Sequence, residues 1–222
     1  MKKAAIVALL VLVILFAALA LSYTSDVITA RRETPTIVEG VLSSNRIKLH
    51  LEDFPPDRLE MLLAVEDPAF YSHNGMDLST PGAGLTTITQ ALVKLLYFDP
   101  FRPGISAKLK QTLIAVFALD ALVSKETQLL LFVNIVYLGR NGSEQIWGFA
   151  DAAEAYFDKE FRELTDEEYL ALVGMIIAPN GVHVRREPAR NAERVARIKR
   201  VLSGDYQPKG LMDFYYDADA GS

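Results

Sequence analysis

The chain has 222 residues, a net charge of −5, a mean hydropathy of +0.17 and no cysteine, and half of its residues are hydrophobic. The apolar half excludes a disordered chain, and the absence of cysteine excludes disulfides, zinc–thiolate sites and a cysteine nucleophile. The acidic isoelectric point, about 5.3, argues against nucleic acid as a partner. This length favours one domain with a short appendage.

The chain begins with an apolar segment of membrane-spanning length. Residues 4–21 are an unbroken run of 18 apolar residues behind Lys2 and Lys3, and a spanning helix needs about 20. The two lysines favour a cytoplasmic N-terminus, which places the following chain on the other side of the membrane. A cleaved signal peptide is the alternative, although the run exceeds the usual apolar region of such peptides. We therefore expect a transmembrane signal-anchor over residues 1–23.

The exported part is more acidic than the whole chain. Removing Lys2 and Lys3 takes the net charge from −5 to −7. Binding of an anionic substrate would therefore require a local cluster of cations.

Residues 24–58 are expected to form a juxtamembrane segment with short strands. Ile47, Leu49 and Leu51 alternate with polar residues, which is a strand pattern. Gly40 and the polar residues 43–45 suggest a turn before this segment.

Residues 59–204 are predicted to form a mainly α domain, because apolar residues recur at helical spacing behind N-cap signals. The expected N-terminal signals are Asp57 with Glu60, Thr86 or Thr87, Ser106, Ser124, Ser143, Thr165 with Glu168, and Pro188. Residues 205–222 are expected to be a loose C-terminal tail, although its aromatic residues could pack on the domain.

Two acids, Glu66 and Asp67, follow the apolar run 61–65. Carboxylates are unfavourable at a helix C-terminus, unless one of them caps a neighbouring helix or serves a site. A carboxyl group with apolar surroundings has a raised pKa, which suits a general acid or base. A purely structural role is the more common explanation for such a pair taken alone.

A second polar group comprises Thr86, Thr87 and Gln90 at a loop-to-helix junction. Free N–H groups and hydroxyls at a helix N-terminus bind anions, although simple capping is the alternative. Lys94 shares a helix face with Gln90. Lys108 and Lys110 could supply the local positive cluster, or could lie on a solvated face.

Taken together, these segments resemble the transglycosylase domain of penicillin-binding proteins and of monofunctional peptidoglycan glycosyltransferases, glycosyltransferase family 51. Residues 64–77 match the first family motif, and residues 86–94 are similar to the second. Residues 124–159 resemble the fourth motif region, and residues 164–179 the fifth. The resemblance runs in order from about residue 62 to residue 202, and it implies a lysozyme-like helical transglycosylase domain. With 222 residues we expect no transpeptidase domain beside it.

The chain departs from the family pattern at several positions. Residues 78–85 are shorter than the usual connection between the first two motifs. The second family carboxylate, in the third motif, aligns with Thr112, and one cation of that motif aligns with Leu109. Some family members hold a divalent cation near this carboxylate. Because Thr112 replaces it, we expect no metal and no other cofactor.

The resemblance implies that a sugar hydroxyl attacks the anomeric carbon of a glycan carried on undecaprenyl diphosphate, with lipid II as acceptor. It assigns Glu66 as the base, positioned by Asp67 and His73. Binding roles for diphosphate or sugar fall to Lys94, Lys108, Lys110, Thr86, Thr87 and Gln90, and the substrate-binding set also includes Phe70 and Asn134.

The resulting hypothesis is a membrane-anchored peptidoglycan glycosyltransferase in a bacterial inner membrane, with its catalytic domain on the periplasmic side. The main alternative is a catalytically impaired relative that binds lipid-linked glycan or a cell-wall synthase as a scaffold. The replacement by Thr112 and the short loop favour that alternative. A third hypothesis is a lytic transglycosylase, in which a lone Glu cleaves glycan.

Overall fold

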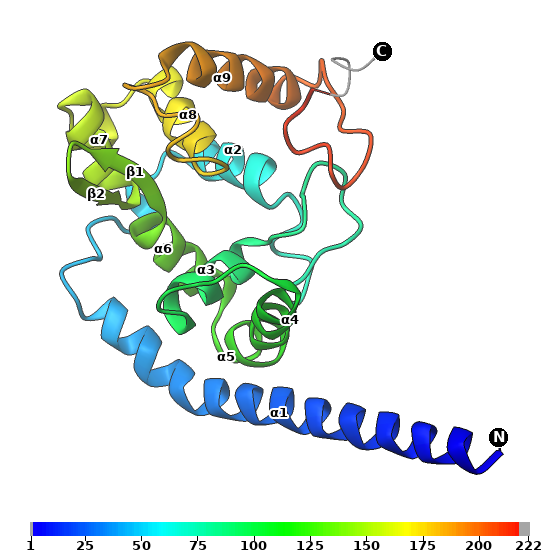
Figure 1. Cartoon of the computed structure of the whole chain (residues 1–222). Helices are drawn as coiled ribbons and strands as arrows, with labels where there is room; N and C mark the ends of the chain where they lie inside the picture. Colours follow the sequence, from blue (N-terminus) through cyan, green and yellow to red (C-terminus); the bar gives the residue numbers. More distant parts are fainter. Residues whose placement is uncertain (1, 218–222) are drawn as a thin grey trace.

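The computed structural model describes residues 2–217, which form a helical body lying along one long helix (Figure 1). The long helix is α1 (Lys2–Leu42). The body contains α2 (Pro56–Glu66), α3 (Ile88–Tyr97), α4 (Ile105–Ile114), a π-helical segment (Ala115–Leu119), α5 (Asp120–Leu122), α6 (Lys125–Ile135), α7 (Gly148–Phe157), α8 (Asp166–Met175) and α9 (Pro188–Leu202). Short 3-10 turns lie at Leu51–Asp53 and Phe161–Glu163. The mainly α class predicted from the sequence is confirmed.

The first half of α1 is exposed on all sides, whereas the second half packs on the body. Of the described residues, those in Ala5–Leu42 form the one helix that is long and apolar enough to cross a membrane, with a window of mean hydropathy 3.1. Further along, Ala30, Thr34 and Val38 are buried. Their spacing of four residues forms a stripe along α1, which packs on α4 and the π-helical segment.

The strands expected within residues 24–58 are wrong. The helix continues to Leu42, because its buried stripe packs on the body. Residues 47–50 have no regular secondary structure, and no strand lies beside them in the described chain. The side chain of Asn134 takes the place of a neighbouring strand: its Oδ1 accepts from the N–H groups of Lys48 (2.8 Å) and Leu49 (2.9 Å).

Two central helices, α6 and α8, contain long runs of consecutive buried residues. In α6 every residue from Leu131 to Ile135 is buried, and in α8 every residue from Tyr169 to Met175 is buried. A helix that is apolar on all sides lies inside a protein. Helices α2, α3, α7 and α9 pack on these two, whereas α4, the π-helical segment and α5 face α1 (Figure 1).

Several predicted helix ends are confirmed. Thr87 and Thr165 begin α3 and α8 with capping boxes, and Ser124 caps α6. By contrast, Asp57 and Ser106 do not cap, since α2 and α4 begin at Pro56 and Ile105.

The helix expected from Ser143 starts later, because a β-hairpin precedes it. β1 (Tyr137–Asn141) pairs antiparallel with β2 (Glu144–Trp147), with Asn141 opposite Glu144 and an irregular register between Tyr137 and Arg140. The turn contains Gly142 at φ +62°. A positive φ at this position is typical of tight hairpin turns.

The C-terminal segment is packed rather than loose, as far as residue 217. Tyr206 and Tyr216 are buried against the body. The expectation for residues 218–222 lies outside the described residues.

Candidate active site

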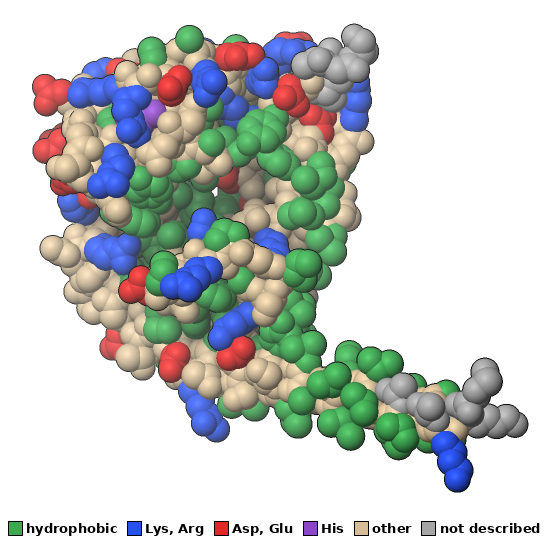
Figure 2. Space-filling model, viewed as in Figure 1, with side chains coloured by type: hydrophobic (Ala, Val, Ile, Leu, Met, Phe, Trp, Pro, Cys, Tyr) green, Lys and Arg blue, Asp and Glu red, His purple; other side chains and the backbone are tan. Residues whose placement is uncertain are grey.

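A cleft of about 410 Å³ opens on one face of the body. Figure 2 shows the hollow on this face, with basic side chains along its lower edge. The lining comes from the end of α2, the loop before α3, α3 itself, the α6–β1 junction, the region after α8, and α9. Among the lining residues are Glu66, Leu85, Thr86, Thr87, Lys94, Tyr137, Arg194 and Phe214. Four of the residues predicted from the sequence, Glu66, Thr86, Thr87 and Lys94, therefore meet in one cavity.

Glu66 is the last residue of α2, and its carboxyl group reaches the cleft. The side chain is half-buried and enclosed by protein. Burial raises the pKa of Glu66 from 4.5 to about 7; Arg194 opposes the rise and Asp67 adds to it. A carboxyl group with a pKa near 7 can exchange a proton at neutral pH, which is what general acid–base chemistry requires.

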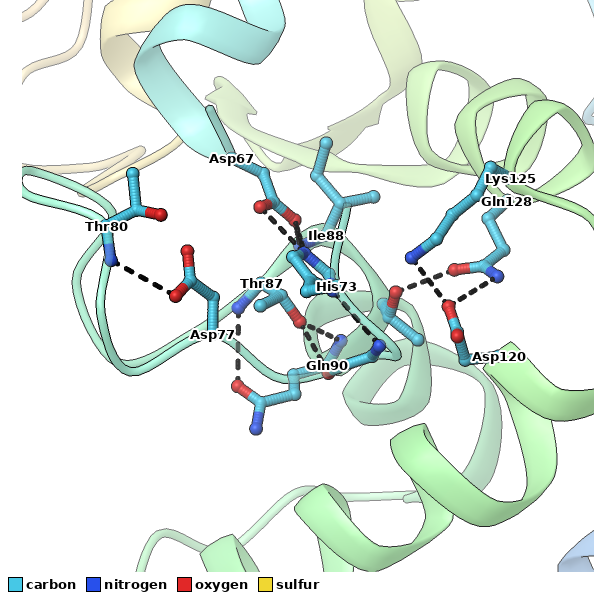
Figure 3. A network of polar contacts seen from close by, with 12 residues as sticks. Asp67, His73, Asp77, Thr80, Thr87, Ile88, Gln90, Asp120, Lys125 and Gln128 are labelled. Atoms are coloured by element: carbon cyan, nitrogen blue, oxygen red, sulfur yellow. Dashed lines mark hydrogen bonds and ion pairs between the residues drawn. The ribbon is translucent and has the colours of Figure 1, made fainter. Parts of the chain in front are cut away.

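Asp67 is not among the residues that line the cleft, and its carboxylate joins three segments (Figure 3). Its Oδ2 accepts from the N–H of Ile88 at 2.9 Å, so it caps the N-terminus of α3. His73 Nε2 lies 2.9 Å from Oδ1, and His73 Nδ1 accepts from the N–H of Gly75 at 3.0 Å. Because Nδ1 is the acceptor, Nε2 is the nitrogen that donates to Asp67. Asp67 and His73 thus hold the backbone that carries Glu66.

The threonines and Gln90 build the N-terminus of α3. Thr87 Oγ1 accepts from the N–H of Gln90 at 3.1 Å and donates to the carbonyl of Gly75 at 2.9 Å. The side chain of Gln90 accepts in turn from the N–H of Thr87. Gln90 is buried below the cleft, so its role is to support the helix end rather than to line the cavity.

The three candidate lysines have different surroundings. Lys94 lines the cleft from α3. Lys108 donates to the carbonyl of Leu85 (2.7 Å), Thr86 Oγ1 (3.0 Å) and Gln90 Oε1 (3.1 Å), so it braces the loop at the rim. Burial, together with the nearby charge of Lys94, lowers the pKa of Lys108 to about 8.

Lys110 does not reach the cleft. Its ammonium group pairs with Asp26 of α1 at 2.8 Å. The positive cluster predicted from the sequence is therefore reduced to Lys94 and Lys108, and Lys110 holds the body to α1 instead.

Phe70 and Asn134, also expected to bind substrate, lie in the interior. Phe70 is 1% exposed, and the ammonium of Lys125 lies 4.7 Å from its ring centroid. Lys125 pairs in turn with Asp120 at 2.6 Å, in the network of Figure 3. Asn134 holds the segment before α2, as described above. Neither side chain lines the cleft.

Thr112, which the resemblance aligns with the second family carboxylate, makes two hydrogen bonds. Its hydroxyl accepts from Gln90 Nε2 at 2.9 Å and donates to the carbonyl of Lys108 at 2.9 Å. The neighbouring donors are an amide and the ammonium of Lys108. Divalent cations of the magnesium class prefer carboxylate and carbonyl oxygens, so this group of residues suits them poorly.

Several residues that line the cleft were not predicted as site residues, among them Tyr137, Arg194 and Phe214. Arg194 is on the buried stripe of α9, together with Asn191, Val195 and Ile198. This i, i+3, i+4, i+7 pattern was a signal that could have indicated a buried arginine. Phe214 comes from the C-terminal segment, and no local pattern brings it to the site.

Comparison with known proteins agrees with this architecture. The sequence profile of the Transglycosylase family matches residues 35–203. Penicillin-binding protein 1B of Haemophilus influenzae is 31% identical over 82% of the chain and 26% of its own length. Penicillin-binding protein 1B of Escherichia coli is 32% identical over 77% of the chain and 22% of its own length. Penicillin-binding protein 1A of Vibrio cholerae is 32% identical over 76% of the chain and 21% of its own length.

The chain spans about a quarter of the length of these relatives. Within the chain, however, the match covers nearly all of the helical body, including α2, α3 and the loop between them. The protein is therefore a member of the transglycosylase family.

Proposed function

We propose that the protein is a membrane-anchored peptidoglycan glycosyltransferase that polymerises lipid II, with Glu66 as general base. The observation that carries this proposal is the placement of Glu66, whose pKa is raised to about 7, in one cleft with Lys94 and the rim hydroxyls of Thr86 and Thr87. This arrangement puts a proton acceptor and a cation in one cavity of about 410 Å³, which is large enough for a glycosidic linkage.

The proposed reaction is a glycosyl transfer. A hydroxyl oxygen of lipid II attacks the anomeric carbon of the growing glycan, and Glu66 takes the hydroxyl proton. The bond from that carbon to the diphosphate oxygen breaks, and its electron pair stays on the leaving lipid diphosphate. Lys94 stabilises the charge that develops there, while Lys108 keeps Leu85 and Thr86 at the rim.

In this proposal α1 holds the body at the periplasmic face of a bacterial inner membrane. The lysines before the apolar run support this orientation. Both substrates are anchored by undecaprenyl chains, so a cleft close to the membrane would meet them in two dimensions. The body itself is acidic, and local cations at the cleft would replace bulk attraction.

The test is polymerisation of labelled lipid II by the purified full-length protein, followed on a gel. We expect wild type to make glycan chains and Glu66→Gln to lose at least about 100-fold in rate, because general base catalysis contributes at least that much. Thr112→Val, which removes from α4 a hydroxyl that bonds Gln90 on α3, serves as a control for indirect effects. A Glu66→Gln protein as active as wild type would overturn the assignment.

The second candidate function is that of a non-catalytic relative that binds lipid-linked glycan or a cell-wall synthase. The hydroxyl of Thr112, committed to Gln90 and the backbone, favours this candidate, because a second carboxylate is missing there. Lipid II binding by wild type without polymerisation, with or without magnesium, would support it. Release of anhydro-muropeptides from sacculi would instead point to a lytic transglycosylase.

A further inference from the structure

The cleft has a wall that the family match does not include. The match ends at residue 203, whereas Phe214 lines the cavity. In Figure 1 the C-terminal segment leaves the end of α9 and comes down beside the loop that precedes α3. This segment, residues 206–217, is called the C-terminal wall below.

Two backbone hydrogen bonds join the C-terminal wall to that loop. The N–H of Gly82 donates to the carbonyl of Gly210 at 2.9 Å, and the N–H of Gly84 donates to that of Leu211 at 2.8 Å. Alternate N–H groups of one segment thus pair with consecutive residues of the other. The shortened 78–85 loop is therefore not free over the cleft, but fixed to the C-terminal wall.

The two glycines are suited to this contact. Both have positive φ, +80° at Gly82 and +70° at Gly84. A Cβ at Gly82 would lie 2.8 Å from Pro208 Cγ, and one at Gly84 would lie 3.2 Å from the ring of Phe214. A side chain at either position would meet both backbone strain and the C-terminal wall itself.

The C-terminal wall also reaches the backbone beside Glu66. The hydroxyl of Tyr216, which is 2% exposed, donates to the carbonyl of Val65 at 3.1 Å. The guanidinium carbon of Arg194 lies 4.6 Å from the ring centroid of Tyr216, and Arg194 Nη1 donates to the carbonyl of Phe214 at 2.8 Å. Tyr216 itself has a φ of +57°, a conformation that persists only when its surroundings impose it.

The C-terminal wall is held in shape by its own contacts as well. Asp213 Oδ2 accepts from the hydroxyl of Tyr206 at 2.6 Å and from the N–H of Lys209 at 2.9 Å. These bonds close the segment into a compact turn before it returns to the cleft.

We propose that the C-terminal wall is an integral part of the active site, which fixes the 82–84 loop at the cleft and positions Glu66 through Tyr216. Tyr216 is a positioning residue. Its hydroxyl bonds the carbonyl of Val65, next to Glu66, and the guanidinium of Arg194 lies over its ring. The positioning part of this inference rests on the proposed function, because it takes Glu66 as the base. The contact with the loop does not depend on it.

Several charged or titratable groups face Glu66 from the elements around it. Asp67 directly after α2, Arg194 on α9 and Tyr216 of the C-terminal wall act on Glu66 electrostatically. Lys94 on α3 and Tyr137 on β1 line the same cleft. Opening the C-terminal wall would admit water to Glu66. Because burial is the main cause of the raised pKa, the pKa would then fall toward its ordinary value.

The experiment compares Tyr216→Phe and Tyr216→Ala with the control variants Tyr71→Phe and Tyr71→Ala in the full-length protein. Tyr71 lies outside both the C-terminal wall and the cleft lining, and it is 57% exposed. Hydrogen exchange is followed in peptides covering residues 79–86 and, as a reference for the fold, residues 166–175. Lipid II polymerisation is measured across pH with the same proteins.

We expect Tyr216→Phe to speed exchange at residues 82–84 about fivefold, since one hydrogen bond is lost. Tyr216→Ala should speed it at least tenfold, lower kcat more than it changes KM, and move the rising limb of the pH–rate profile to lower pH. The Tyr71 variants should match wild type. If Tyr216→Ala also speeds exchange at residues 166–175, its fold is disturbed, and the result for Tyr216→Phe then decides whether the proposal holds.

If exchange at residues 82–84 is unchanged in both Tyr216→Phe and Tyr216→Ala, the proposed role of the C-terminal wall in fixing the loop is wrong. If a variant exchanges faster at residues 82–84 but keeps the wild-type pH–rate profile, the positioning role of Tyr216 is wrong. A wild-type protein without polymerase activity would defeat the proposed function instead. The exchange data would still test the C-terminal wall in that case, so the two failures are distinguishable.

Discussion

At the scale of single residues, Glu66 links protonation to stability. Its pKa is raised from 4.5 to about 7 in the folded protein. Between these values the unfolded chain releases the proton while the folded chain keeps it, so stability falls as pH rises through this window. The total loss is about 3 kcal/mol, because one unit of pKa corresponds to about 1.4 kcal/mol.

Glu66→Gln should remove this dependence, since an amide does not ionise. We expect the variant to gain stability relative to wild type on going from pH 4 to pH 8, by up to about 3 kcal/mol, while its activity is lost. Urea denaturation in detergent at the two pH values measures the change. The same stability difference at both pH values would contradict it, and would mean that Glu66 titrates normally.

Some site residues could be predicted from local patterns, and others could not. Glu66 and Asp67 stood out as paired acids at a helix end, and the structure gives one of them to the cleft and the other to a helix cap. Thr87 was visible as a cap. Phe214 had no such signal, because only tertiary packing brings a C-terminal residue to a loop more than a hundred positions earlier.

At the scale of elements, Asp67 sets how α2 meets α3. One carboxylate accepts from the N–H of Ile88 and from His73, so the end of one helix is tied to the start of the next. Asp67→Asn leaves a single oxygen for these two donors. We expect a loss of about 1–3 kcal/mol in unfolding free energy, because a buried donor is left without its partner, and a reduced polymerisation rate.

The matched control is Asp53→Asn. Asp53 also accepts from a backbone N–H, that of His50 at 2.7 Å, but this bond closes a local turn away from the cleft. Thermal unfolding and the lipid II assay compare the two variants. If Asp53→Asn slowed polymerisation as much as Asp67→Asn, the link between α2 and α3 would not be what supports Glu66.

The elements that the sequence predicted correctly are those with their own end signals. Thr87 with Gln90 and Thr165 with Glu168 satisfy backbone groups within three residues, so their pattern is local. The hairpin at 137–147 was missed, because the alanine-rich segment after it suggested a helix as far back as Ser143. The Asn141-Gly142 pair, a strong hairpin signal, outweighed that segment in the fold.

At the scale of the whole molecule, α1 is shared between two environments. Its exposed apolar half has the composition of a membrane span, and its second half belongs to the body. Because the helix is continuous to Leu42, the side of α1 that packs on α4 also fixes how the body is held relative to the apolar half. No sequence periodicity marked this change, since α1 is apolar before it and mixed after it.

A hydroxyl pair tests this docking. Thr34 Oγ1 donates to the carbonyl of Ala30 at 2.6 Å and meets the hydroxyl of Tyr97 on α3 at 2.7 Å. Thr24 Oγ1 likewise donates to the carbonyl four residues earlier, that of Ala20 at 2.8 Å, but it lies on an exposed face of α1. We expect Thr34→Val to lower the unfolding free energy by about 1 kcal/mol, because Tyr97 loses a partner, and Thr24→Val to leave it unchanged. Chemical denaturation in detergent measures both; equal effects would mean that α1 is held without this contact.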